Sequence, residues 1–487
     1  MNDPQTACLK ARIDAARAAL PAWQARPVKT RARLVGAVRH ALAQEADTVI
    51  AAVGDRFDRG PAETLTTEII PLADAARFIE RCAARVLAPR HFGAGGRPAW
   101  LWGVRGTVRR VPLGVVAIIA PGNYRLLLAG VQILQALAAG NAVIVKPAPG
   151  ASAPLVWLRA ALIAAGLPSA LFQIIAEDQS AGEALASAAI DKLYLTGSAA
   201  TGRAVASRLA ARTVPAVLEL SGNDAVFVLA GADIDRAARA IVWGMGLNGG
   251  ATCIAPRRVF VVRGRFEALA SALRTALANA PANAPARAVA AGPRATAVTR
   301  IAAARAAGWD VLGTPPAPGV INMTPCVLAS HAMSEPPLPG DLFAPVATLQ
   351  PIDTIDEAIA IDHGADHALG AAVFGDPAEA GALAQRLHAG VVTINDVIAP
   401  TADPRAPFAG AKASGHGATR GVEGLLAMTR PQTVLTRHGT ARPHLAPASV
   451  HDAGLFKAYL AIAHGKGLKQ KLAALKTTIR AARARMG

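Results

Sequence analysis

The sequence predicts an α/β protein built on mainly parallel sheets. Between Val115 and Ala211, short apolar runs alternate repeatedly with helical segments, and a second α/β pattern follows from about Ser221 to Ile394. Strands that alternate with helices at this spacing indicate βαβ units. Hydrophobic residues make up 52% of the 487 positions and charged residues 17%, which is typical of a globular chain and not of a disordered one.

The first part of the chain is predicted to be helical. From Lys10 to about Ala94, alanine-rich stretches carry apolar residues at helical spacing. The segment from Trp100 to Val111 then alternates around Arg105-Gly106, which predicts a β-hairpin that turns at this pair. The alternating region that follows is predicted to contain strands at 115–120, 142–145, 172–175 and 192–195, with helices at 126–139, 154–165, 182–189 and 202–211.

The second part is predicted to repeat the alternation and then to lose it. Strands are expected at 258–262, 371–374 and 391–394, with surface helices and loops between Asn279 and Pro318. From His438 onward the alternation stops. The final segment carries apolar residues at helical spacing among basic ones, which predicts a basic amphipathic helix with Leu468, Leu472, Leu475 and Ile479 on one face.

The charge of the chain is concentrated at this end. The net charge is +18, and beyond Arg430 ten basic residues face a single acid, Asp452. This tail has no interleaved aromatic platform, so we expect no nucleic-acid partner. A basic amphipathic helix is suited to an anionic membrane surface, and a second interpretation is that it packs on a partner subunit.

The cysteines and the N-terminus indicate a cytoplasmic protein. Four cysteines lie far apart without metal or disulfide spacing, so we expect no metal and a reducing compartment. The first residues carry no basic-then-apolar signal. The longest apolar stretch, Leu126 to Val145, is interrupted by polar residues and reads as a buried helix and strand. The expectation is a cytoplasmic enzyme, with the tail as a candidate membrane contact.

Turns at the ends of the predicted strands carry polar residues and glycines. Pro121-Gly122-Asn123-Tyr124 follows the first strand, Lys146-Pro147 the second, and Thr196-Gly197-Ser198 a later one. Parallel sheets bind ligands at this edge, and a helix N-terminus offers amides to phosphate. The other interpretation of the Gly-Ser turn is a simple helix cap.

Cys253 is the candidate nucleophile. It follows the flexible Gly249-Gly250 pair and precedes Pro256, so a loop could present its thiol. The competing interpretation is a buried, inert cysteine. Glu219 lies in an apolar run, where a glutamate is rare unless it is paired or functional.

Seven motifs follow one another along the chain: Pro121-Gly122-Asn123-Tyr124, Lys146-Pro147, Leu195-Thr196-Gly197-Ser198, Leu218-Glu219-Leu220-Ser221-Gly222, Gly250-Ala251-Thr252-Cys253, Leu342-Phe343-Ala344-Pro345-Val346, and Pro407-Phe408-Ala409-Gly410 with Lys412-Ala413-Ser414-Gly415. In this order they resemble the aldehyde dehydrogenase superfamily over roughly residues 10 to 435. Cys253-Ile254-Ala255-Pro256 and Asn395-Asp396-Val397 are most similar to its class 3 branch, whose members often oxidise fatty or aromatic aldehydes.

The resemblance implies a Rossmann-type cofactor domain at 1–220 with an oligomerisation hairpin around 100–111, a catalytic domain at 221–395, a return segment at 396–435 and a basic tail at 436–487. It also implies a homodimer.

The resemblance implies NAD(P)-dependent oxidation of an aldehyde to a carboxylate. Cys253 would attack the carbonyl, Asn123 would donate to the oxyanion, and Glu219 would activate water. Asn395 and Phe408 fall in motifs on the substrate side, and their competing interpretation is a loop amide and a core aromatic. The residues expected to bind NAD or NADP are Lys146, Gly197, Ser198, Gly202, Leu220, Asp341 and Phe343.

Departures from the family pattern leave other activities open. Pro149 stands where many NAD-preferring members have a glutamate, so a barrier to NADP is missing. Asp341 is one methylene shorter than the usual glutamate, and Ala251 replaces a glutamine. The competing hypotheses are a CoA-acylating or acyl-reducing enzyme and a catalytically poor cofactor-binding scaffold. Retention of Glu219 favours hydrolysis, because acylating relatives commonly lack that base.

Overall fold

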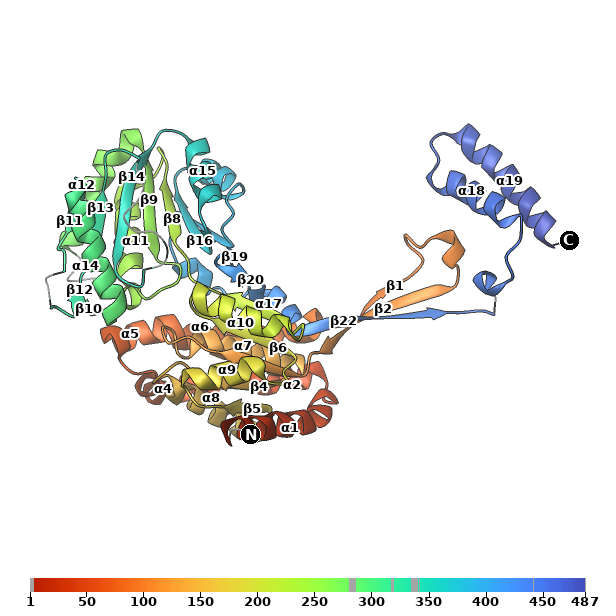
Figure 1. The fold of residues 1–487 in the computed structure, drawn as a ribbon, viewed down its shortest axis with the longest axis horizontal. Helices are drawn as coiled ribbons and strands as arrows, with labels where there is room; N and C mark the ends of the chain where they lie inside the picture. Colours follow the sequence, from red (N-terminus) through yellow and green to blue (C-terminus); the bar gives the residue numbers. More distant parts are fainter. Residues whose placement is uncertain are drawn as a thin grey trace. The chain divides into compact units, whose positions relative to one another are not determined.

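The computed structural model describes residues 4–279, 286–316, 319–333, 340, 342–440 and 442–486, and it divides into two units (Figure 1). The first unit contains Met1–Arg90 and Val108–Thr433, and the second contains His91–Thr107 and Val434–Gly487. The first unit holds both large sheets. The expected domain boundaries at residues 220, 395 and 435 stay a prediction.

The first unit begins with helices, as predicted. Along α6 the buried residues Leu72, Ala76, Ile79 and Ala83 recur every three or four positions, so one face of the helix joins the core. The elements are α1 (Pro4–Gln24), α2 (Val28–Gly36), α3 (Val38–Gln44), α4 (Ala46–Val53), the 3₁₀ turn η1 (Arg56–Asp58), α5 (Pro61–Thr64), the π-helical turn η2 (Leu65–Ile69) and α6 (Ile70–Val86).

A six-stranded sheet forms the core under these helices, with strand order β20-β7-β6-β3-β4-β5. All pairs except β20–β7 are parallel, which confirms the predicted βαβ units. Every residue of β3 is buried because helices cover both faces. The elements are β3 (Val115–Ile119), α7 (Leu127–Ala139), β4 (Ala142–Lys146), α8 (Ser152–Ala164), η4 (Ser169–Leu171), β5 (Phe172–Ile174), α9 (Gln179–Ser187), β6 (Lys192–Thr196), α10 (Ala199–Ala210), β7 (Ala216–Glu219) and β20 (Gly415–His416).

A seven-stranded sheet has the order β11-β13-β14-β9-β8-β16-β17, and its side chains alternate between two helical layers. Val226 and Val228 of β8 pack with helices α11 and α12, while Phe227 packs with α15 and α16. The elements are β8 (Asp224–Val228), α11 (Ile234–Gly246), η5 (Leu247–Gly250), β9 (Pro256–Val262), η6 (Arg263–Arg265), α12 (Phe266–Ala278), α14 (Ala291–Ala306), β11 (Asp310–Gly313), β13 (Cys326–Ala329), β14 (Val346–Ile352), α15 (Ile355–Gly364), β16 (Gly370–Phe374), α16 (Pro377–Ala384) and β17 (Val391–Ile394).

Short ladders and turns complete the first unit. Three two-stranded pairs are β10–β12, β15–β19 and β18–β21. Their bounds and those of the remaining elements are β10 (Arg287–Ala288), β12 (Asn322–Met323), β15 (His367–Ala368), η7 (Ala399–Ala402), β18 (Phe408–Ala409), β19 (Ala411–Lys412), β21 (Ala418–Thr419) and α17 (Gly421–Ala427).

The hairpin predicted over residues 100–111 is wrong, because this segment contains a single strand that runs through Arg105-Gly106. Arg105 and Gly106 both lie inside the strand β2 (Val104–Pro112), which is central in a sheet of order β1-β2-β22. A Cβ atom at Gly106 would come within 2.0 Å of the Phe92 ring. Gly106 therefore leaves room for the Phe92 ring to pack across the strand. The sequence alone does not distinguish such a glycine from one in a turn. The neighbouring elements are β1 (Arg90–Phe92), η3 (Ala99–Leu101) and β22 (Thr429–Arg437).

The predicted basic C-terminal helix is present as α19 (Leu468–Met486), after η8 (Pro443–Leu445) and α18 (Asp452–His464). Its apolar residues Leu468, Leu472, Leu475 and Ile479 are all exposed. Among the residues described here, no helix is both long enough and apolar enough to cross a membrane.

Candidate active site

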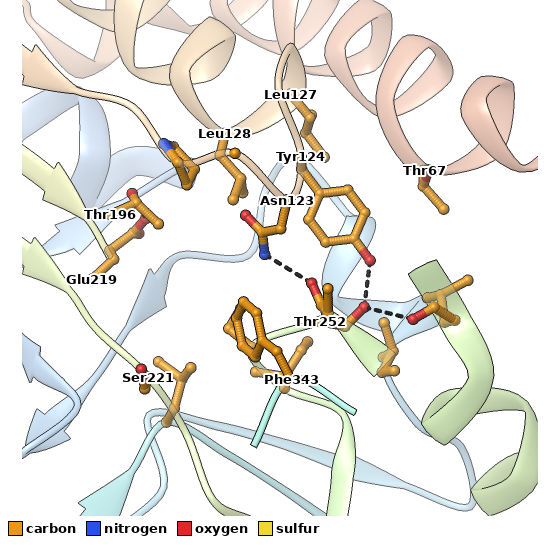
Figure 2. Close-up of a pocket in the computed structure, with 18 of the residues that line it drawn as sticks. Thr67, Asn123, Tyr124, Leu127, Leu128, Thr196, Glu219, Ser221, Thr252 and Phe343 are labelled. Atoms are coloured by element: carbon orange, nitrogen blue, oxygen red, sulfur yellow. Dashed lines mark hydrogen bonds between the residues drawn. The ribbon is translucent and has the colours of Figure 1, made fainter. Parts of the chain in front are cut away.

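A cavity of about 990 Å³ opens beside the carboxyl ends of β3, β6 and β7 (Figure 2). Asn123, Glu219 and Cys253 all line it, although they come from three separate parts of the chain. Parallel sheets commonly place ligand sites at this edge. The structure thus brings together the three residues that the sequence singled out for chemistry.

The loop that carries Cys253 has an unusual backbone. Asn248, Gly249 and Gly250 all adopt positive φ angles of 53°, 63° and 80°. A Cβ at Gly250 would lie 2.5 Å from the carbonyl carbon of Ala344, so only glycine fits there. This close turn ends at Cys253, whose side chain is half-buried and borders the cavity.

A buried arginine fixes the same loop through hydrogen bonds to backbone carbonyls. Arg257 donates to the Gly250 carbonyl at 2.6 Å and to the Ala344 carbonyl at 2.7 Å. Hydrogen bonds from a charged donor to buried carbonyls are strong. The backbone before the thiol is therefore fixed by both sterics and hydrogen bonding.

Asn123 is tied to the nucleophile loop. Its Nδ2 donates to the Ala251 carbonyl at 3.0 Å (Figure 2), two residues before the thiol. Asn248 Nδ2 in turn donates to the Asn123 carbonyl at 3.0 Å. The Asn123 amide nitrogen carries a second N–H, and both Asn123 and Cys253 border the cavity.

Tyr124 and Thr252 form a second link between the two loops, which sequence reasoning missed. The Tyr124 and Thr252 hydroxyls are 2.6 Å apart (Figure 2). Burial raises the pKa of Tyr124 well above its ordinary value, so the phenol stays protonated. Tyr124 stands beside Asn123 in the sequence, but nothing there shows that it meets Thr252.

Glu219 ends β7 with a buried carboxylate that has neutral hydrogen-bond partners. It accepts from the Thr419 hydroxyl, from the Thr196 hydroxyl at 3.2 Å and from Gln132 Nε2 at 3.4 Å. Figure 2 shows Thr196 beside it. Burial raises the pKa of Glu219, while these hydrogen bonds and the charge of Arg420 act in the opposite direction.

Arg420 is a further cavity residue that the sequence did not reveal. Its guanidinium lies 5.3 Å from the centre of the Phe408 ring and donates to the Thr401 carbonyl at 2.7 Å. Burial lowers the pKa of Arg420, and the charges of Glu219 and Cys253 raise it. An arginine in a Gly-rich loop has no sequence signal that separates a cavity position from a surface one.

Some of the residues expected to bind a dinucleotide line the cavity and others do not. Gly197, Ser198, Leu220 and Phe343 line the cavity. Ser198 also caps α10, because its Oγ accepts from the Thr201 amide at 3.2 Å. Asp341 lies outside the described residues.

Lys146 and Gly202 lie outside the cavity lining. Lys146 ends β4 as a buried residue whose pKa burial lowers, with Asp178 and Glu177 acting against that effect. A Cβ at Gly202 would approach Leu220 Cδ1 to 2.5 Å. Gly202 therefore allows α10 to pack closely against Leu220.

The two substrate-side expectations had opposite outcomes. Phe408 lines the cavity, but Asn395 does not. The Asn395 side chain accepts from the Gly375 amide and donates to the Gly375 carbonyl, both at 3.0 Å. These contacts favour the interpretation of Asn395 as a loop amide, which fastens the loop after β17 to the end of β16.

One group of potential metal ligands lies elsewhere. Asp362, His363 and His388 have ligand atoms within 4.8 Å of one another. The two imidazole rings are stacked at 3.9 Å and nearly parallel, at 7°. In-plane lone pairs on parallel rings do not converge on one ion. Asp362 also accepts from the His388 amide at 2.7 Å, so the cluster has an internal structural role.

Comparisons with known proteins agree with this arrangement. The chain is 30% identical over 471 residues to the 4,4'-diapolycopene aldehyde oxidase of Methylomonas sp, which covers 94% of this chain and 88% of that protein. Its fold is similar to a Mycobacterium tuberculosis aldehyde dehydrogenase complexed with NAD+, with a TM-score of 0.82, 26% identity and coverage of 90% and 92%.

A third similarity involves the other nicotinamide cofactor. The NADP-dependent glyceraldehyde-3-phosphate dehydrogenase from Bacillus halodurans, complexed with NADP, matches with a TM-score of 0.80, 26% identity and coverage of 89% and 91%. The profile of the aldehyde dehydrogenase family matches residues 2–434. The chain belongs to the aldehyde dehydrogenase family.

Proposed function

We propose that this aldehyde dehydrogenase oxidises an aldehyde to a carboxylate with NAD or NADP, through a covalent intermediate on Cys253. The observation that carries the proposal is the convergence of Asn123, Glu219 and Cys253 on one cavity. A thiol, an amide donor and a carboxylate with a raised pKa are the groups that this chemistry requires.

In the first step, the Cys253 thiolate attacks the aldehyde carbon and its sulfur forms a bond to it. The carbonyl oxygen becomes an oxyanion, which accepts hydrogen bonds from Asn123 Nδ2–H and from the backbone N–H of Cys253. Loss of hydride from this carbon gives a thioester. A bound nicotinamide ring supplies the acceptor for that hydride.

In the second step, Glu219 takes a proton from water, and the resulting hydroxide adds to the thioester carbon. The C–S bond then breaks, which releases the carboxylic acid and restores the thiolate. A base must be ionised to do this, and a pKa raised toward neutrality makes proton uptake more effective. The hydroxyls of Thr196 and Thr419 keep part of the carboxylate population ionised.

The cavity wall fits a dinucleotide. Gly197 and Ser198 begin α10, where free amides and the helix dipole favour a pyrophosphate. Phe343 and Leu220 add apolar surface suited to a nicotinamide ring. Pro149 presents no carboxylate to repel a 2′-phosphate, so both NAD and NADP are expected to bind.

The substrate is proposed to be a long-chain or aromatic aldehyde. The cavity is lined by many apolar side chains, and the similar Methylomonas protein is named for 4,4'-diapolycopene aldehyde. An apolar wall gains free energy by removing hydrocarbon from water. The apolar lining residues include Leu127, Leu128, Trp243, Leu247, Leu342, Leu369, Ile398 and Phe408.

The test is turnover of short, long-chain and aromatic aldehydes with NAD and with NADP. Cys253→Ala is expected to abolish reduction of the cofactor, whereas Cys82→Ala, a matched half-buried cysteine on α6, is expected to retain it. Activity that survives in Cys253→Ala would contradict the covalent mechanism. An acyl-CoA product in place of the acid would show a CoA-acylating enzyme, and cofactor binding without turnover would show a scaffold.

We also propose a cytoplasmic homodimer. Among the described residues, Cys8, Cys82, Cys253 and Cys326 form no disulfide, as in a reducing compartment. Strand β22 is an edge strand whose residues are mostly exposed, Val434 and Leu435 among them, and exposed edges favour pairing with another chain. Light scattering is expected to give twice the chain mass for the wild type and a monomer for Leu435→Glu; a monomeric wild type would contradict this.

The tail is proposed to contact an anionic membrane surface. On α18 and α19, exposed Phe456, Leu460 and Leu472 accompany several lysines, a combination that binds acidic lipid interfaces. Deletion of 455–487 is expected to abolish binding to vesicles that contain phosphatidylserine. Equal binding by the full chain and the deletion variant would contradict this contact and favour packing on a partner subunit.

A further inference from the structure

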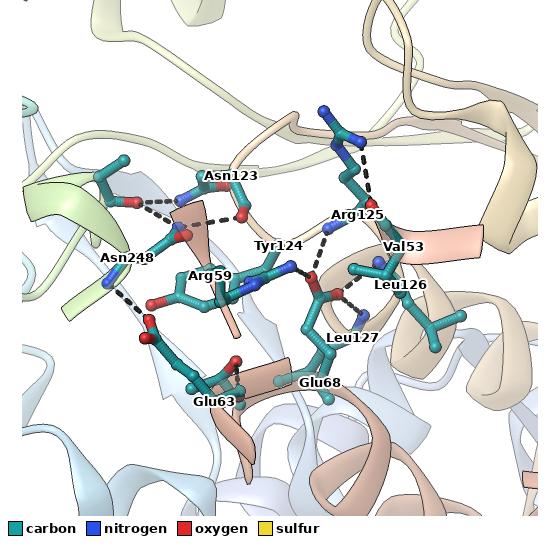
Figure 3. Close-up of polar contacts among 12 residues, drawn as sticks. Val53, Arg59, Glu63, Glu68, Asn123, Tyr124, Arg125, Leu126, Leu127 and Asn248 are labelled. Atoms are coloured by element: carbon teal, nitrogen blue, oxygen red, sulfur yellow. Dashed lines mark hydrogen bonds and ion pairs between the residues drawn. The ribbon is translucent and has the colours of Figure 1, made fainter. Parts of the chain in front are cut away.

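Two carboxylates on one helical segment hold the two loops of the active site (Figure 3). Glu63 lies on α5, and Glu68 lies five residues later in the π-helical turn η2. Neither belongs to the motifs that the sequence analysis used. Their contacts, however, lead directly to Asn123 and to the loop of Cys253.

Glu68 fixes the start of α7, just after Asn123. Its carboxylate accepts from the amides of Leu126 at 2.6 Å, Leu127 at 3.0 Å and Arg125 at 3.3 Å. These are donors that the first turn of a helix leaves without partners in the helix. Glu68 is completely buried, and the Arg59 guanidinium donates to it at 2.5 Å. The oxyanion loop therefore ends on a charged, buried anchor.

Glu63 fixes the loop of the nucleophile. It accepts from the Asn248 amide at 2.9 Å and pairs with Arg287 at 2.5 Å. Asn248 is buried with a left-handed backbone, a conformation that is strained for a residue with a side chain. The hydrogen bond to Glu63 holds this conformation in place.

Asn248 then joins the two anchors. Its side chain donates to the Asn123 carbonyl at 3.0 Å and to the Ala251 carbonyl at 3.3 Å. Asn123 donates to that same Ala251 carbonyl. Figure 3 shows Glu63, Asn248 and Asn123 in one chain of contacts, with Glu68 beside it. A movement of either anchor would change the position of the oxyanion donor relative to the thiol.

The π-helical turn explains how one segment reaches both loops. At 3.6 residues per turn, side chains five positions apart point about 140° away from each other. Bonding from residue i to i+5 widens the turn and brings such residues toward the same face. Because η2 begins two residues after Glu63 and contains Glu68, the chain from one carboxylate to the other runs through this widened turn, and both can face the same pair of loops. π-turns of this kind often occur at functional sites.

We infer that Glu63 and Glu68 are positioning residues which, through the π-helical turn η2 that contains Glu68, set Asn123 against Cys253. Neither touches the reacting atoms in this account. The inference rests on the proposed function for its catalytic consequence. The contacts that it invokes exist independently of any activity.

The test compares Glu63→Gln and Glu68→Gln with Glu80→Gln. Glu80 lies on α6 and pairs with Arg39, so it is a matched carboxylate in an ion pair away from both loops. We expect kcat to fall at least tenfold in the first two variants, with NAD and NADP affinity within twofold of wild type. Glu80→Gln is expected to keep kcat within twofold. A purely structural role would not separate kcat from cofactor affinity in this way.

Hydrogen exchange gives a readout that needs no activity. Glu63→Gln is expected to speed exchange of amides in 247–253, and Glu68→Gln of those in 125–127. Deletion of Thr66, which turns η2 into an α-helical turn while both carboxylates remain, is expected to speed both. A folded Glu63→Gln variant with wild-type exchange and kcat would overturn the inference, even if Glu68→Gln failed to fold. A wild type without aldehyde oxidation would refute the proposed function. The hydrogen-exchange rates would still test whether Glu63 and Glu68 hold the two loops in place.

Discussion

Two buried glutamates lie at the candidate active site, but their surroundings differ. Glu68 is 0% exposed and meets the Arg59 guanidinium and three backbone amides, so its negative charge has a direct ion-pair partner. Glu219 is 6% exposed and accepts from two hydroxyls and the amide of Gln132, and the charge of Arg420 offsets its burial only in part. Burial alone therefore does not decide how a carboxylate behaves. Its hydrogen-bond partners decide whether a carboxylate anchors structure or exchanges a proton.

The largest effect is expected from Glu219→Gln. Without the base, thioester hydrolysis should slow by about 10²- to 10⁴-fold, the usual contribution of general-base catalysis. The first turnover should still reduce the cofactor, so rapid mixing should show a burst of reduced nicotinamide and then almost no steady rate. A variant that keeps the wild-type steady rate would place the base elsewhere.

A smaller loss of kcat is expected from Asn123→Ala, which changes the loop that Glu68 holds. Removal of one oxyanion donor costs about 10²- to 10³-fold in kcat. The slow step should then be formation of the thioester, so the same rapid-mixing measurement should show no burst. A burst in Asn123→Ala like that of Glu219→Gln would mean that Asn123 and Glu219 do not act on different steps of the reaction.

The free energy of unfolding should fall more in Glu68→Gln than in Glu219→Gln. Glu68→Gln leaves the buried Arg59 charge without a counter-charge, which should lower the free energy of unfolding by about 3 to 5 kcal/mol. Glu219→Gln removes a charge that burial penalises and that Arg420 offsets only in part, so it should change stability at neutral pH less than Glu68→Gln does. Urea denaturation of both variants gives the comparison. An equal loss in both would show that the partners of the two carboxylates make no difference.

The smallest effect is a shift in pH dependence. Burial raises the pKa of Glu219, so the hydrolysis rate should be lost as pH falls through that raised value. Thr419→Val removes a hydrogen bond that lowers this pKa, so the midpoint of the pH–rate profile should move upward. Glu219→Gln should lose the transition. A midpoint that moves downward in Thr419→Val would contradict the assignment.

The same raised pKa has an opposite consequence for stability. Because the folded state resists ionisation of Glu219, its contribution to stability is present below the unfolded pKa and is lost as pH rises through the folded one. The stability of Glu219→Gln relative to wild type should therefore increase with pH over that range. Thermal denaturation at several pH values measures this difference.

The sheets and the loops that carry Asn123 and Cys253 were predictable because their signals are local. β3 and β4 are continuous apolar runs that end in polar turns, and Asn123 stands in one of those turns. Cys253 follows two glycines whose backbone angles only glycine readily adopts. Such features depend on a few neighbouring residues, so the sequence alone carries them.

The supporting residues were not predictable because their partners are distant. Glu68 meets Leu126 across 58 positions, and Thr419 meets Glu219 across 200. Two interpretations of Asn395 stayed open for a similar reason, since the sequence does not show its hydrogen bonds to Gly375. Gly106 was misread as a turn because the crossing Phe92 ring lies 14 residues away. In each case a tertiary contact decides what the local pattern leaves open.

The most direct measurement is the mass of the Glu219→Gln protein after incubation with an aldehyde and NAD or NADP and rapid quenching. We expect the mass of Glu219→Gln to increase by one acyl group, which peptide mapping should locate on Cys253. The Glu219→Gln, Cys253→Ala double variant should lack this group. Cofactor reduction with no adduct on Cys253, or an acyl group carried by another residue, would contradict the central claim.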